Sequence, residues 1–234
     1  MNTPEIFSFV GGGGKTSCIH FFARKYGKRK KVMITTTTHI QTQPFFTLEN
    51  PTIFEIEQAF QTENILCIVQ SLPQCCKKTM PTNLQDIVQY FIERQQDMYF
   101  LIEADGSRQL PVKAPADYEP VILPETTHVF AIAGLDAIQQ PIFQVAHRPD
   151  IYAKLLQKSK QELITPQDMM FVLTHPKGQK KSVVSNFTII LNKADSDIQI
   201  QYAREAIQYT SEEVWIACFQ NSTILAKHNI KEYI

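Results

Sequence analysis

One stretch near the beginning of the chain decides the fold: Ile6-Phe7-Ser8-Phe9-Val10-Gly11-Gly12-Gly13-Gly14-Lys15-Thr16. Residues 6–10 predict a short buried strand that ends at the four glycines. Apolar residues then recur at helical spacing, at Ile19, Phe22, Ala23 and Tyr26. Gly27 marks the end of this helix, and the apolar residues 32–34 begin a second strand. Strand, loop, helix and strand in this order predict a βαβ unit with two parallel strands.

The glycine loop matches the second half of the phosphate-binding pattern GxxxxGK[ST], with Phe9 in place of the first glycine. Glycines allow main-chain amides to close around phosphate oxygens, and the start of a helix adds partial positive charge. We expect Lys15 to neutralise the β and γ phosphates and the Thr16 hydroxyl to ligate Mg²⁺. The alternative is a tightly packed glycine turn without a ligand. The predicted nucleotide-binding residues of the loop are Gly11, Gly12, Gly13, Gly14, Lys15, Thr16 and Ser17.

Acidic residues follow another apolar strand, predicted over residues 98–102. A phosphate loop needs such an acidic partner at the end of a neighbouring strand. Alternation along the chain puts Glu103 and Asp105 on the same side, where either can hold Mg²⁺ while the other orients water or substrate. We assign Asp105 to the metal and Glu103 to the attacking water. The alternative is a solvated acidic turn.

A buried strand is also predicted over residues 187–191, and Asn192-Lys193-Ala194-Asp195 follows it. This sequence resembles the NKxD motif with which GTPases recognise guanine. The Asp195 carboxylate can accept from both N1–H and the exocyclic amine of guanine, which adenine cannot offer, while the Lys193 stem can lie over the base. A surface turn is the alternative, and no DxxG sequence follows the acidic strand as it does in GTPases. The predicted nucleotide is therefore GTP or ATP.

The remaining chain alternates predicted strands and helices, which indicates an α/β fold like that of P-loop NTPases, a mainly parallel sheet with helices on both faces. We predict one domain over residues 1–234, with residues 40–81 as an irregular insertion. The expected helix starts are a capping box at Thr82 and Gln85, Thr165 with Pro166 and Asp168, and Ser196. Further strands are expected over residues 129–133 and 214–217.

The composition excludes several classes of function. Lys and Arg total 23, as do Asp and Glu, so no net charge attracts nucleic acid or an anionic membrane. No apolar run reaches the roughly 20 residues of a membrane span, and the beginning of the chain lacks a signal-peptide pattern, so we expect a cytoplasmic protein. The cysteines lack CxxC spacing and are expected to be reduced thiols, not a metal site. They are Cys18, Cys67, Cys75, Cys76 and Cys218.

Several further motifs occur together with the glycine loop and residues 191–195. They are Glu103-Ala104-Asp105-Gly106-Ser107-Arg108, then Leu110, Pro111 and Lys113-Ala114-Pro115, the threonines at 35–38 before His39, Ala133-Gly134-Leu135-Asp136, and His147-Arg148-Pro149. Together they resemble the YqeC family of selenium-dependent molybdenum hydroxylase accessory proteins over most of the chain. The resemblance implies a P-loop protein that acts in maturation of molybdenum hydroxylases. Its partner would be a client hydroxylase or the cofactor of that enzyme.

Two basic residues lie just beyond the acidic strand end. Arg108 and Lys113 are placed to clamp a phosphate or the anionic cofactor of a client enzyme. Asp117 and Glu119 lie nearby and can pair with these bases instead.

Three functions are consistent with these residues. The first is a Mg²⁺-dependent NTPase in which γ-phosphate contacts order residues 108–120 and hydrolysis releases them. Its catalytic residues would be Lys15, Glu103, Asp105, Arg108 and Lys113. The second is a phosphoryl- or nucleotidyl-transferase that acts on a cofactor precursor. The third is a scaffold that binds nucleotide without catalysis and recruits a client.

Overall fold

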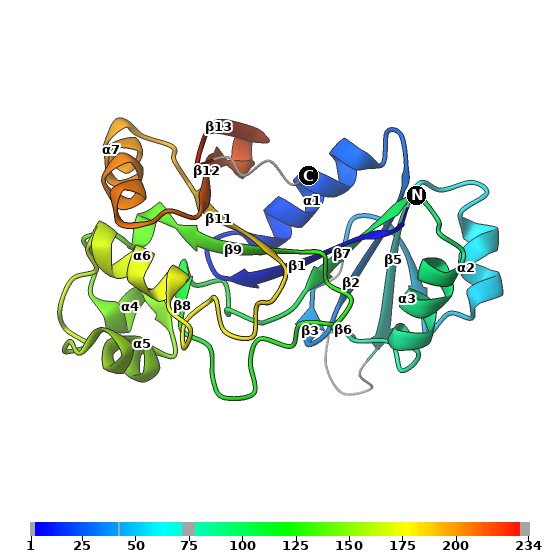
Figure 1. The fold of residues 1–234 in the computed structure, drawn as a ribbon, viewed down its shortest axis with the longest axis horizontal. Helices are drawn as coiled ribbons and strands as arrows, with labels where there is room; N and C mark the ends of the chain where they lie inside the picture. Colours follow the sequence, from blue (N-terminus) through cyan, green and yellow to red (C-terminus); the bar gives the residue numbers. More distant parts are fainter. Residues whose placement is uncertain (1–2, 42, 72–77, 230–234) are drawn as a thin grey trace.

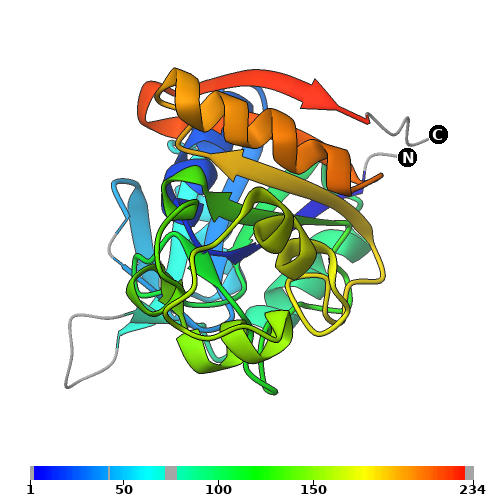
Figure 2. The same cartoon turned by 90° about the vertical axis from the view of Figure 1, so that its left-hand side faces the viewer.

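An eleven-stranded sheet forms the centre of the computed structural model, which describes residues 3–41, 43–71 and 78–229 (Figure 1). Its strands are β1 (Glu5–Gly11), β2 (Lys31–Thr36), β3 (His39–Ile40), β4 (Phe46–Glu49), β5 (Ile65–Ser71), β6 (Lys78–Thr79), β7 (Met98–Glu103), β9 (His128–Gly134), β11 (Asn186–Asn192), β12 (Glu213–Cys218) and β13 (Thr223–His228). Their spatial order is β13-β12-β11-β9-β1-β7-β2-β5-β6-β3, and β4 pairs with β5. Figures 1 and 2 show the sheet twisting strongly across the molecule.

Most neighbouring strands are parallel, as the alternation of predicted elements indicates. The antiparallel pairs are β12 with β13, β5 with β6 and β3 with β6. A separate small sheet pairs β8 (Val112–Lys113) with β10 (Ala146–His147). The prediction of an α/β protein with a mainly parallel sheet is therefore confirmed.

Helices cover both faces of the sheet because alternate strand residues point to opposite sides. Phe7 and Phe9 of β1 pack with α1 (Lys15–Tyr26), whereas Ile6 and Val10 belong to the cores on the other face. The other face carries α2 (Ile53–Ala59), α3 (Leu84–Glu93), α6 (Pro166–Thr174) and α7 (Asp197–Ala206). The short helices α4 (Ile142–Val145) and α5 (Pro149–Leu156) precede α6 in the chain (Figure 1).

The glycine loop leads into a helix that is anchored by aromatic residues. Phe22 of α1 is fully buried and contacts Phe9 of β1, with 5.7 Å between the ring centroids. Trp215 of β12, the single tryptophan of the chain, packs on the same ring at 5.9 Å. Helix α1 is thereby fixed to strands from both halves of the sequence.

Helix starts were predicted with mixed success. Thr165 and Asp168 form a capping box at α6, and Ser196 accepts from the Gln199 amide at α7, as expected. The capping box at Thr82 and Gln85 is wrong, because α3 begins at Leu84 after Asn83 and has no side-chain cap. The helix nevertheless buries one apolar face, at Leu84, Ile87, Val88 and Phe91.

Two regions differ from the pattern-based expectation. Residues 40–81, where the pattern predicted an irregular insertion, contribute β4, α2 and β5, and β4 and β5 extend the parallel sheet. Strand β13 was not predicted, because its residues alternate only between exposed and half-buried positions. Cys18, Cys67 and Cys218 are buried free thiols, while Cys75 and Cys76 lie outside the described residues. Within the described ranges, no helix is long and apolar enough to span a bilayer.

Candidate functional site

The strand order brings the sequence motifs to one edge of the sheet. β1 lies between β7 and β9, and β11 follows β9. Because these strands are parallel, their carboxyl ends lie at the same edge, where open α/β sheets bind ligands. The glycine loop after β1, Asp105 after β7, Gly134 at the end of β9 and Asn192 at the end of β11 therefore meet.

The glycine loop passes too close to its neighbours for side chains. Gly13 has a φ of 69°, and a Cβ atom there would lie 2.1 Å from the Gly134 amide nitrogen. A Cβ atom on Gly12 would lie 2.5 Å from the Leu110 carbonyl oxygen. Residues with side chains would clash with the main chain at both positions, which explains the glycine run in physical terms.

The first three amides of the loop have partners within the protein. The Gly11 amide donates to both Asp105 carboxylate oxygens at 3.1 Å. The Gly12 amide donates to the Ile132 carbonyl at 2.9 Å, and the Gly13 amide to the Leu110 carbonyl at 3.0 Å. In this conformation the amides of Gly11, Gly12 and Gly13 therefore bind protein oxygens.

The start of α1 is open by comparison. Gly14 is its N-cap residue, in a left-handed conformation with a φ of 118°, and has no side-chain cap. The first turn carries no acidic residue. Lys15 is buried, Thr16 is half-buried and Ser17 is exposed, so this turn lies partly at the surface. An uncapped helix start of this kind favours an anion.

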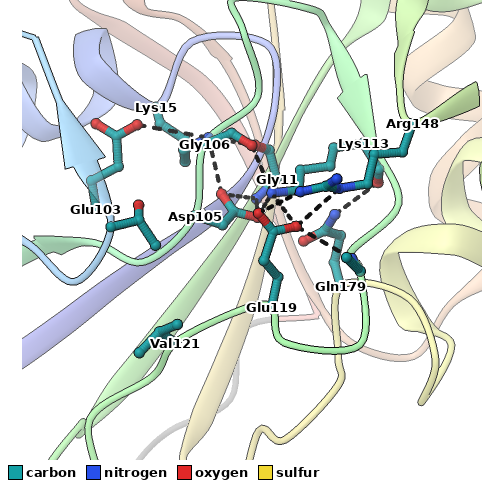
Figure 3. Close-up of polar contacts among 12 residues, drawn as sticks. Gly11, Lys15, Glu103, Asp105, Gly106, Lys113, Glu119, Val121, Arg148 and Gln179 are labelled. Carbon is teal, nitrogen blue, oxygen red and sulfur yellow. Dashed lines mark hydrogen bonds and ion pairs between the residues drawn. The ribbon is translucent and has the colours of Figure 1, made fainter. Parts of the chain in front are cut away.

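A buried cluster of charges lies beside the loop (Figure 3). The Lys15 ammonium lies 3.1 Å from Asp105 Oδ1 and also donates to the Gly11 carbonyl. The Lys113 ammonium lies 3.2 Å from Asp105 Oδ2 and 3.0 Å from Glu119 Oε2. The side chains of Lys113 and Asp105 are both fully buried. Two cations on one carboxylate compensate the high cost of burying these charges.

The cluster extends to the surface through Glu119 and Arg148. Arg148 donates to Glu119 through Nε at 3.2 Å and through Nη2 at 2.9 Å, a two-pronged contact. Its Nη2 also donates to the Tyr118 hydroxyl at 3.1 Å. Burial alone would raise the pKa of Glu119, but its bonds to Arg148 and Lys113 outweigh this effect and lower the pKa below its ordinary range. Gln179 supports the cluster from behind by donating to the Lys113 carbonyl at 2.7 Å.

Glu103 lies at the edge of this cluster and has unusual acidity. Burial, with a smaller contribution from Asp105, raises its pKa to about 7, while Lys15 and Lys113 oppose the shift. Its nearest cation is Lys15, 4.0 Å away. The backbone carbonyl of Glu103 accepts from the Thr36 hydroxyl at 2.8 Å and from the Thr37 amide at 3.1 Å. A carboxyl group with a pKa near neutrality suits proton transfer at physiological pH.

The motif at residues 192–195 contacts the glycine loop directly. Asn192 donates from Nδ2 to the Gly13 carbonyl at 2.7 Å and accepts from the Phe219 amide at 3.1 Å. Asp195 is exposed, and its Oδ1 accepts from the Cys218 thiol at 2.6 Å. Lys193 has a φ of 63° and pairs with Asp136 at 2.6 Å. The motif therefore lies at the same sheet edge as the loop.

The predicted site residues are not all in one place. Lys15, Glu103, Asp105 and Lys113 lie in or beside the buried cluster, whereas Arg108 is exposed on a turn outside it. Within the part of the chain that the structure describes, Thr16 makes no hydrogen bond to Asp105. Both Asp105 oxygens face cations and the Gly11 amide, so in this conformation they are unsuited to Mg²⁺. Across the residues described, no group of three or more His, Cys, Asp or Glu side chains could hold a metal.

Comparison with known proteins places the chain in a family. A sequence model described as YqeC protein matches residues 7–150. The chain belongs to the YqeC family. It is also 26% identical to the uncharacterised protein YqeC of Escherichia coli strain K12 over 236 aligned positions. The alignment covers 96% of this chain and 91% of that protein. The resemblance seen in the motifs is thereby confirmed.

The cluster contains partners that the motifs of this YqeC-family chain did not assign. Glu119 was expected to pair with Arg108 or Lys113, and it pairs with Lys113 and Arg148. Arg148 lies in the His147-Arg148-Pro149 motif, but nothing in the sequence pointed to Glu119 as its partner. The packing of Leu110 on the glycine loop was also missed, because a main-chain contact leaves no signature in side-chain patterns.

Proposed function

We propose that this YqeC-family protein is a Mg²⁺-dependent, nucleotide-binding protein of GTPase type that serves as an accessory factor in maturation of selenium-dependent molybdenum hydroxylases. The observation that carries the proposal is the hydrogen bond from Asn192 to the Gly13 carbonyl. It joins the loop expected to hold phosphates to the motif expected to hold the base, at the carboxyl edge of a parallel sheet.

The glycine loop supplies the phosphate part of the proposed site. The uncapped amides of Lys15, Thr16 and Ser17 and the ammonium group of Lys15 provide positive potential at the start of α1. This arrangement favours an anionic ligand, which supports a nucleotide triphosphate as the proposed ligand. Lys15 and Lys113 would stabilise negative charge on the phosphoryl group, the largest electrostatic requirement of phosphoryl transfer.

The acidic residues supply the remaining roles. Glu103, with its pKa near 7, is the candidate for orienting the attacking water and accepting its proton. Mg²⁺, when bound, would supply further positive charge against the phosphates. Thr16 would hold the ion, and Asp105 could join it only after leaving Lys15 and Lys113.

Asp195 supports guanine over adenine as the base. Its carboxylate is exposed, so a base can reach it, and the thiol of Cys218 fixes one of its oxygens. Lys193 pairs with Asp136 in this structure, and its stem would have to leave that pair to cover the base.

Calorimetry with GTP, ATP and a non-hydrolysable analogue, with and without Mg²⁺, tests the proposal. Lys15→Ala should weaken triphosphate binding at least about tenfold, or about 1.4 kcal/mol, while Lys154→Ala on the exposed face of α5 should not. Circular dichroism checks that both variants fold. Equal affinity of Lys15→Ala and the wild type would contradict the proposal.

Product analysis then assigns the reaction. Release of free phosphate without a modified acceptor supports the NTPase. A labelled acceptor formed in step with the nucleoside product indicates a transferase instead. Binding without turnover, even with a client hydroxylase present, indicates a scaffold.

A further inference from the structure

Asp105 occupies an anion site built by the protein itself. Its carboxylate accepts from the Gly11 amide and lies within 3.2 Å of the ammonium groups of Lys15 and Lys113. The side chains of Asp105 and Lys113 are fully buried, and that of Lys15 is 3% exposed. A main-chain amide with two ammonium groups is a donor set that a phosphate group can also use.

Residues 106–113 cover this site. The Leu110 carbonyl accepts from the Gly13 amide at 3.0 Å, and the Pro111 carbonyl accepts from the Gly134 amide at 2.8 Å. Lys113 donates to the Gly106 carbonyl at 2.6 Å, which closes the segment on itself. The Gly13 amide is therefore already bonded to this segment and is not free for the proposed phosphate.

The tip of the segment is held in an unfavourable conformation. Arg108 and Gln109 are both exposed and have φ values of 50° and 65°. Left-handed backbone is unfavourable for a residue other than glycine. Opening the segment would relieve this cost, so the closed form depends on the contacts of Asp105, Leu110 and Pro111.

We propose that Asp105 is an internal anion that holds the phosphate site closed, and that a triphosphate displaces it and lifts residues 106–111, which precede Lys113, from the glycine loop. The proposal rests on the proposed nucleotide-binding function and adds its regulation. A triphosphate carries more negative charge than one carboxylate, so Lys15, Lys113 and the Gly11 and Gly13 amides prefer it once the segment moves. Asp105 is thus a competitor of the ligand in the closed state.

The role of Asp105 can be tested with inorganic tripolyphosphate in the presence of EDTA. Asp105→Asn removes the competing charge and keeps the side-chain shape. It should bind tripolyphosphate at least about tenfold more tightly than the wild type, whereas Asp117→Asn, an exposed acid of the following loop, should bind as the wild type does. Binding that is unchanged or weaker in Asp105→Asn would overturn the proposal, and weaker binding confined to Mg²⁺-containing buffer would assign Asp105 to the metal.

Limited trypsin digestion of the wild type gives an independent readout. Arg108 is exposed on the tip of the segment, and its cleavage product is identified by its loss in Arg108→Gln. Saturation with a non-hydrolysable triphosphate should speed this cut several-fold as the segment opens. An unchanged rate at saturation would overturn the opening. If neither the wild type nor Asp105→Asn binds any triphosphate, the proposed function itself falls. If the wild type binds triphosphate but its cleavage is not faster and Asp105→Asn does not bind more tightly, only the proposed closed state is removed.

Discussion

The side-chain amide of Asn192 donates a 2.7 Å hydrogen bond to the carbonyl of Gly13, although the two residues are 179 positions apart in the sequence. The same side chain accepts from the amide of Phe219 at 3.1 Å. One buried amide therefore links the glycine loop, the end of β11 and the end of β12. This arrangement fixes the position of the loop relative to the proposed base site.

Substitutions at Asn192 should distinguish the contributions of its two hydrogen bonds. Asn192→Asp keeps an acceptor for the Phe219 amide but loses the donor to Gly13, whereas Asn192→Ala loses both. A buried polar group left unsatisfied costs about 1–3 kcal/mol, so the alanine variant should be destabilised by about 2–4 kcal/mol and should bind triphosphate more weakly. Urea unfolding with calorimetry measures both effects. A stable Asn192→Ala with normal affinity would show that the link is dispensable.

Glu103 should make stability depend on pH. Burial raises its pKa from the ordinary 4.5 to about 7, so the folded state holds this proton more tightly than the unfolded state does. Stability is therefore lost as pH rises from about 4.5 to 7, by about 3 kcal/mol in total. Glu103→Gln cannot ionise, and its stability relative to the wild type should rise by about 2–3 kcal/mol between pH 5 and pH 8.

Urea unfolding of both proteins at the two pH values measures the difference. Glu205→Gln, an exposed carboxyl group on α7, is the control and should shift stability equally at both pH values. The same gap between Glu103→Gln and the wild type at pH 5 and pH 8 would contradict a raised pKa.

Glycines near the proposed phosphate site should tolerate side chains very unevenly. Gly13→Ala combines a left-handed φ of 69° with a Cβ atom 2.1 Å from the Gly134 nitrogen, so we expect a loss of about 2–4 kcal/mol in the free energy of unfolding. Gly106→Ala is the matched control, because a Cβ atom there meets nothing within 4 Å. Chemical denaturation of the two variants tests the difference. Similar stabilities would mean that the loop shifts easily.

Base selectivity should depend on Asp195. Asp195→Asn exchanges one acceptor oxygen for a donor, so the affinity ratio of GTP to ATP should fall at least about tenfold while tripolyphosphate binding stays the same. Asp197→Asn, two residues further on in the first turn of α7, is the control and should leave the ratio unchanged. Competition of the two nucleotides for a fluorescent analogue measures the ratio. An unaltered ratio in Asp195→Asn would exclude guanine recognition by this carboxylate.

The sequence predicted those parts of the fold and site that repeat a local pattern. The apolar strands, the glycine loop and the acidic residues after β7 each have a signature within a few neighbouring positions. The parallel sheet then follows from the alternation of strands and helices, and it brings Lys15 within 3.1 Å of Asp105.

The parts that were missed depend on contacts between distant segments. Leu110 meets the glycine loop through its main chain, which any residue could supply. Arg108 and Lys113 looked equivalent as basic residues, yet one is exposed and the other fully buried between Asp105 and Glu119. Their difference arises from the path of residues 106–113 and not from the chemistry of either side chain.

The packing of Trp215 on Phe22 gives the molecule a fluorescent reporter without any label. The chain has a single tryptophan, this residue is 8% exposed, and it lies against the helix whose first turn is the proposed phosphate site. Lys227 lies 3.6 Å from the centre of its ring, which makes the emission sensitive to small shifts at this contact. Any ligand that moves α1 against β12 should therefore change the intrinsic emission, and stopped-flow mixing of unmodified protein can follow the event in time.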